Sequence, residues 1–109
     1  MRIAVSVLAI LFGLLHVIAA RTQLKSTDAA AKGFAIVMLC GGVCTAAMAV
    51  AHLAGGSTAW TDALFVAVGC LLVCAAAYEN GRRSGNLHPS HHIVRGTIAA
   101  LLVVGFLIW

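Results

Sequence analysis

Residues 59–95 read AWTDALFVAVGCLLVCAAAYENGRRSGNLHPSHHIVR, and this stretch decides the fold. Its first part, Ala59–Tyr78, is apolar almost throughout and has about the 20 residues that a helix needs to cross the hydrocarbon of a membrane. Its second part, residues 79–95, holds the only proline and three of the five histidines of the chain. An apolar run followed by such a polar segment indicates a membrane-spanning helix and the loop at its end.

Three further apolar runs lie outward from this stretch: Ile3–Ala20, Gly33–Ala54 and Ile93–Trp109. Of the 109 residues, 62% are hydrophobic and 9% are charged, whereas a soluble domain is about half hydrophobic and about a quarter charged. None of the runs alternates polar and apolar residues as a β-barrel strand does. We therefore predict one all-α domain over residues 1–109, an integral membrane four-helix bundle. Its transmembrane helices are expected at about residues 3–20, 28–54, 59–80 and 90–109.

Short polar segments with capping residues separate the four runs. The predicted N-caps are Ser26, Thr27 or Asp28 for the second helix and Ser57 or Thr58 for the third. Gly55 and Gly81 are the expected stops of these two helices, since glycine adopts the left-handed conformation at little cost. Pro89 suits the first turn of the fourth helix.

The basic residues predict the orientation in the membrane. Six of the seven lie on the side of the first and third connections: Arg21, Lys25, Lys32, Arg82, Arg83 and Arg95. Only Arg2 lies on the other side. Because cytoplasmic loops carry an excess of Lys and Arg, both connections are expected in the cytoplasm and both termini on the outer side. This pattern predicts a multi-pass protein of the cell membrane, most simply a bacterial inner membrane.

The same basic residues bear on the partners of the protein. They lie at helix ends, where they fix orientation, so nucleic acid is not expected as a partner. Arg82, Arg83 and Arg95 are expected to set the orientation or to contact lipid phosphates. The lipid bilayer is the expected partner, together with further copies of the chain or a larger membrane complex.

The segment His88-Pro-Ser-His91-His92 is the first candidate for chemistry. Imidazole is the commonest metal ligand, and three imidazoles within five residues can converge on one ion where the backbone turns. His16 and Glu79 are expected on the same side of the membrane, so they join the candidate metal or haem ligands. The alternatives are a lipid-phosphate or pH-responsive site, and histidines that merely pack at the membrane interface.

The H-x-x-H-H spacing resembles one of the histidine boxes of membrane di-iron desaturases and hydroxylases. The resemblance covers five of the 109 residues, and those families use several such boxes where this chain has one. Enzyme activity is therefore not carried over. In size and number of spans the chain is similar to small multidrug-resistance transporters. Their first span carries a glutamate, whereas here it carries only His16 as an ionisable group.

The four cysteines form the second candidate, as Cys40 with Cys44 and Cys70 with Cys74. Residues four apart share one helix face, so each pair makes a stripe. Four thiolates could hold a soft metal ion, and a pair could change redox state. The alternative is that cysteine serves as a small apolar residue at helix contacts. Gly42-x-x-x-Ala46, Gly96-x-x-x-Ala100 and the alanines of the third span also predict close helix packing.

His52 and Asp62 form the third candidate, because the short connection after Gly55 brings them to the same outer end. The pair could bind a cation or relay a proton, and the alternative is a plain hydrogen bond at the interface. As a whole, the sequence predicts an accessory membrane protein that binds a metal, haem or anionic lipid through the cytoplasmic histidines. Three alternatives remain. The first is a transporter or channel subunit that acts as a homo-oligomer with His16 and His52 along its path. The others are an enzyme of the di-iron or redox type and a structural protein without a site.

Overall fold

The computed structural model describes residues 1–109 and consists of four α-helices without strands. They are α1 (Arg2–Gln23), α2 (Ala29–Ala54), α3 (Ala59–Arg83) and α4 (Pro89–Ile108), and all four are long and apolar enough to span a membrane. The predicted fold class, an all-α membrane bundle of four spans, is confirmed. Large apolar side chains such as Leu8, Leu71 and Leu101 are more than half exposed, as suits a surface that lies in lipid.

The helix ends follow the predicted caps with one difference. Asp28 caps α2 through a hydrogen bond from the backbone N–H of Ala30, and α2 ends at Gly55, whose φ of +75° needs glycine. The expected stop at Gly81 is wrong, because α3 continues through Gly81 to Arg83. The positive φ that follows α3 occurs at Gly85, and Arg83 in the last turn suits the negative end of the helix dipole.

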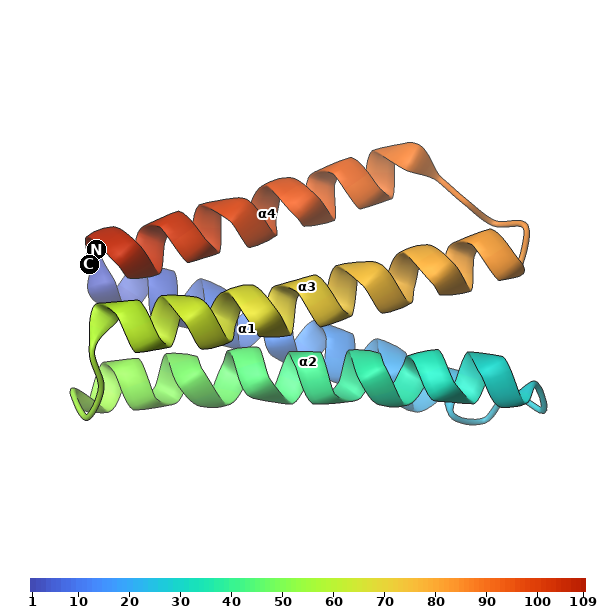
Figure 1. The fold of residues 1–109 in the computed structure, drawn as a ribbon, viewed down its shortest axis with the longest axis horizontal. Coiled ribbons are helices and arrows are strands. Elements are labelled where there is room, and N and C mark those ends of the chain that lie inside the picture. Colours follow the sequence, from blue (N-terminus) through green and yellow to red (C-terminus); the bar gives the residue numbers. More distant parts are fainter.

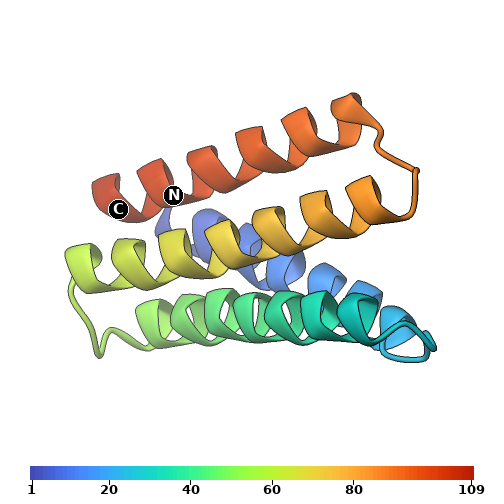
Figure 2. The same cartoon turned by 45° about the vertical axis from the view of Figure 1, so that its right-hand side comes forward.

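Each helix runs antiparallel to the next, and both chain termini lie at one end of the bundle (Figure 1). We call this the terminal end, which also contains the connection 55–58; the loop end contains the connections 24–28 and 84–88. The helix α2 packs closely against α1 and α3. The helix α4 packs against α3, touches α1 over a small area only, and diverges from its neighbours towards the loop end (Figures 1 and 2).

Backbone contacts at glycines explain why α2 lies so close to its neighbours. A Cβ at Gly13 would lie 2.5 Å from the carbonyl oxygen of Gly42, so α1 and α2 touch through their backbones. A Cβ at Gly41 would lie 2.6 Å from the carbonyl oxygen of Gly69, which places α2 equally close to α3. Such contacts between small residues are a common way to pack helices in membranes. The two glycines of α4 make no comparable backbone contact, since Gly105 meets the side chain of Val5 and Gly96 has nothing within 4 Å.

Thr58 and Thr61 form a reciprocal capping box at the start of α3. The Thr61 N–H donates to the Thr58 hydroxyl at 3.3 Å, and the Thr58 N–H donates to the Thr61 hydroxyl at 3.2 Å. We expect Thr58→Ala to lower the free energy of unfolding by about 1 kcal/mol, since it leaves first-turn donors unpaired. Unfolding in detergent, followed by helical circular dichroism, measures the change. Ser57→Ala is the control, and equal stabilities of the two variants would contradict the cap.

Candidate functional site

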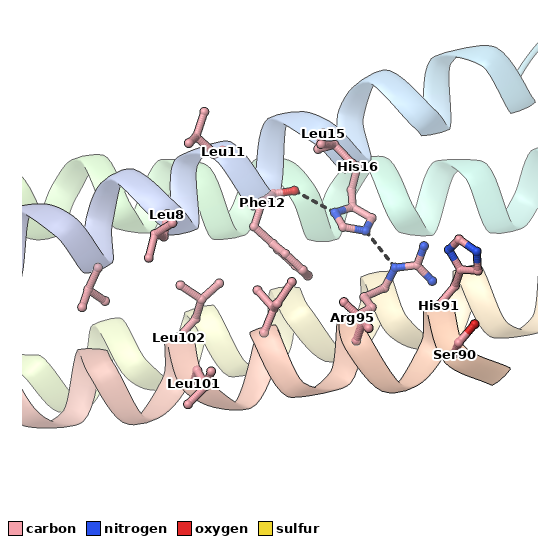
Figure 3. Close-up of a pocket in the computed structure, with 13 residues that line it drawn as sticks. Leu8, Leu11, Phe12, Leu15, His16, Ser90, His91, Arg95, Leu101 and Leu102 are labelled. Atoms are coloured by element: carbon pink, nitrogen blue, oxygen red, sulfur yellow. Dashed lines mark hydrogen bonds between the residues drawn. The ribbon is translucent and has the colours of Figure 1, made fainter. Parts of the chain in front are cut away.

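His16 lies in the middle of a polar contact between α1 and α4. Its side chain is buried, its Nδ1 lies 2.7 Å from the carbonyl oxygen of Phe12, and Arg95 Nε donates to its Nε2 at 3.0 Å. The two contacts assign the tautomer: Nδ1–H donates to the carbonyl, and the Nε2 lone pair accepts from the guanidinium. His16 is therefore fully hydrogen-bonded and holds Arg95 in one orientation (Figure 3).

Arg95 is the one charged group at this contact, and no carboxylate neutralises it. The three acids of the chain pair elsewhere: Asp28 with Arg83 at 4.0 Å, Glu79 with Arg82 at 2.8 Å, and Asp62 with His52 at 2.6 Å. Besides His16, the guanidinium meets only His92, with Nη1 3.5 Å from Nδ1. A guanidinium has five N–H donors, so most of them are free to bind a ligand.

Two cavities meet at Arg95. The larger is a groove of about 740 Å³ between α1 and α4, and the smaller is a polar pocket of about 430 Å³ at the loop end. Both are lined by Leu15, His16, His91 and Arg95. Figure 3 shows Leu8 of α1 and Leu102 of α4 pointing towards each other, with His91 and Ser90 at one end of the groove. The groove is apolar along its length and polar at this end alone.

The structure distributes the predicted metal ligands over several separate contacts. His88 and His91 lie near each other, with ring centroids 5.6 Å apart, whereas His92 packs edge-on against Tyr78 at 5.5 Å. Glu79 accepts two hydrogen bonds from Arg82 on the exposed surface. No three His, Cys, Asp or Glu side chains form a group that could hold a metal ion. Metal or haem binding stays a prediction, and a cation here would also face the charge of Arg95.

The cysteines likewise do not converge. All four are free thiols; Cys40 is exposed, Cys70 is buried, and Cys44 and Cys74 are half-buried. The Cys44 thiol reaches the carbonyl oxygen of Phe65 at 3.6 Å, a contact between α2 and α3. The contact of Cys44 is of the kind that a small residue makes between helices, whereas Cys40 is exposed. A redox role stays a prediction.

His52 and Asp62 do meet, at the terminal end. His52 Nδ1 lies 2.6 Å from Asp62 Oδ2, and the two side chains are 5% and 0% exposed. The ring of Phe106 lies 4.7 Å from that of His52, and Arg2 donates to the His52 carbonyl oxygen. His52 Nε2 and Asp62 Oδ1 have no partner. Neither cavity at His16 is lined by His52, so the two predicted path residues lie in separate surroundings.

Sequence reasoning missed the contact between Arg95 and His16. It grouped Arg95 with Arg82 and Arg83 as residues that set the orientation or contact lipid phosphates, whereas α4 begins at Pro89 and carries Arg95 in its second turn, against α1. The signal was the spacing of His91 and His92 to Arg95, since residues three and four apart share a helix face. Sequence reasoning also missed the hydrogen bond from the Asn80 amide to Gln23, which joins α3 and α1 near the same pocket.

No protein-family model matches this sequence, and no curated protein or solved structure is significantly similar to it.

Proposed function

We propose that this membrane protein binds an oxyanion, a phosphate group above all, at the loop end of the bundle through Arg95. One observation carries the proposal: Arg95 has no carboxylate partner, although it is half-buried at the meeting point of the two cavities. A partly desolvated cation without a counterion is costly inside a membrane protein. A bound anion would remove that cost.

The surroundings of Arg95 suit a planar or tetrahedral oxyanion. The Nε–H of Arg95 donates to His16, so the imidazole of His16 holds the guanidinium in place. The two terminal nitrogens of Arg95 remain for the ligand. Guanidinium groups bind phosphate with two parallel hydrogen bonds, which are stronger than neutral ones. His91 and Ser90 line the same end of the groove and offer further hydrogen-bonding groups. In this proposal His16 is a positioning residue and Arg95 contacts the ligand.

The alternatives have less support. A metal ion would need three convergent ligands and would lie beside a guanidinium of like charge. A path for transport would need His16 and His52 in one cavity, and the two cavities at His16 do not include His52. A structural protein without a site could use Arg95 to fix its orientation in the membrane, but this role does not account for the two cavities that meet at Arg95.

We expect Arg95→Gln to weaken binding of dihexanoyl phosphatidic acid about tenfold to a hundredfold, because hydrogen bonds to charged groups each contribute about 1.5–3 kcal/mol. The short-chain lipid presents a phosphate monoester without a long tail, and inorganic phosphate serves as the tail-free probe. Native mass spectrometry of detergent-solubilised protein measures both affinities. Arg95→Lys is expected to retain part of the binding, since it keeps the charge but loses the paired donors.

Arg83→Gln is the matched control, because Arg83 is an exposed arginine at the same end of the bundle. Its loss should leave both probes bound as in the parent. Equal affinities of the parent and Arg95→Gln would reject the proposed function. So would equal losses in Arg95→Gln and Arg83→Gln, since these would indicate attraction by net charge alone.

A further inference from the structure

The groove between α1 and α4 begins at the proposed phosphate site and runs from there towards the terminal end of the bundle. Its walls are apolar except at the end near Arg95, and its volume is about 740 Å³. The apolar lining residues are Val5, Leu8, Leu11, Phe12 and Leu15 of α1 and Val94, Ile98, Leu101 and Leu102 of α4. The polar groups His16, Ser90, His91 and Arg95 lie together at the other end (Figure 3). A ligand that fills this groove must therefore be charged at one end and apolar along the rest.

The groove has about the length that an acyl chain needs to cross one leaflet of a bilayer. On α1 it runs from Val5 to His16, which spans about 16 Å at the helical rise of 1.5 Å per residue. The hydrocarbon core of a bilayer is about 30 Å thick, so each leaflet contributes roughly 15 Å. Arg95 lies in the second turn of α4, and from there its long side chain can reach towards the lipid head groups.

We propose that the groove holds one acyl chain of an anionic phospholipid from the leaflet at the loop end. This inference rests on the proposed phosphate site. The phosphate of this lipid binds Arg95, and the chain lies along the leucines of α1 and α4. The helix α4 diverges from its neighbours towards the loop end (Figures 1 and 2), and the lining residues Leu11, Leu15 and Val94 are exposed, so a lipid can enter the groove sideways without leaving the bilayer.

Charge argues for a lipid rather than a second copy of the chain. A second copy in the same orientation would bring its own loop end to Arg95. That end carries six of the seven basic residues, and its two acids already pair with Arg82 and Arg83. Such a copy therefore offers no free carboxylate to the guanidinium, whereas a phospholipid offers a phosphate on an apolar chain.

The test uses substitutions that fill the groove and leave the phosphate-binding residues unchanged. Leu11 is 57% exposed in the wall of the groove, and Leu71 is 69% exposed on α3 outside it. We expect Leu11→Trp to weaken binding of dioleoyl phosphatidic acid about tenfold to a hundredfold. The indole would fill part of the groove, so the acyl chain would lose apolar contacts with its walls. Leu71→Trp should have no effect on this long-chain lipid. Ile98→Trp, which fills the groove from α4, should repeat the result of Leu11→Trp.

Short and long lipids separate this inference from the proposed function. Dihexanoyl phosphatidic acid should bind the Leu11→Trp protein as it binds the parent, because its phosphate site is intact. Equal retention of the dioleoyl lipid in Leu11→Trp, Ile98→Trp and Leu71→Trp would overturn the acyl groove while leaving the phosphate site standing. Binding of uncharged dioleoylglycerol as tight as that of the phosphatidic acid would also overturn it. An unchanged affinity of Arg95→Gln for the short lipid would reject the phosphate site itself.

Discussion

Asp62→Ala is expected to lower the free energy of unfolding by about 1–3 kcal/mol, because it leaves the buried Nδ1 of His52 without its hydrogen-bond partner. Asp62 is fully buried, and its carboxylate lies 2.6 Å from His52 Nδ1. His52 Nε2 already lacks a partner, so the variant would leave the imidazole without any side-chain hydrogen bond. The lost contact also joins the end of α2 to the start of α3.

Unfolding of the detergent-solubilised protein, followed by helical circular dichroism, measures this change. Asp28→Ala is the control, since Asp28 is exposed and contributes an N-cap of about 1 kcal/mol. A double variant, His52→Leu with Asp62→Leu, should recover most of the stability, because replacing both partners of a buried hydrogen bond by apolar groups leaves no polar atom unpaired. If Asp62→Ala costs no more than Asp28→Ala, the buried pair does not stabilise the bundle.

Features encoded by neighbouring residues could be predicted from the sequence. The four spans follow from apolar runs, and the caps at Asp28 and Thr58 follow from side chains next to the first turns they serve. The contact between His52 and Asp62 could also be predicted, because a connection of few residues leaves little freedom between them. The termini share one end of the bundle, as an even number of spans requires (Figure 1).

Features that depend on helix rotation could not be predicted. His16 and Arg95 are 79 residues apart, and their contact depends on which faces of α1 and α4 meet. Hydrophobic periodicity does not reveal these faces, because lipid and the bundle core are both apolar. The groove depends on the divergence of α4 from α1, which no local pattern encodes. The histidines were visible as a cluster in the sequence, yet the start of α4 turns them towards different partners.

Gly13→Ala is expected to destabilise the bundle by about 1–3 kcal/mol, although alanine favours a helix over glycine. The new Cβ would lie 2.5 Å from the Gly42 carbonyl oxygen and 3.0 Å from the Ala46 Cβ. The carbonyl belongs to the backbone of α2, so it cannot rotate away as a long side chain would. The two helices must separate, and their packing contacts weaken over several turns. Gly13→Leu should destabilise more strongly for the same reason.

Gly96→Ala supplies a control of opposite sign. A Cβ at Gly96 meets nothing within 4 Å, so the substitution should raise the free energy of unfolding by about 1 kcal/mol through helix propensity alone. The two alanine variants add the same methyl group to a membrane helix and differ only in what it meets. A rise in stability for Gly13→Ala like that of Gly96→Ala would mean that α1 and α2 do not touch at their backbones. Opposite signs would tie the stability of the bundle to that contact, because helix propensity favours both variants alike.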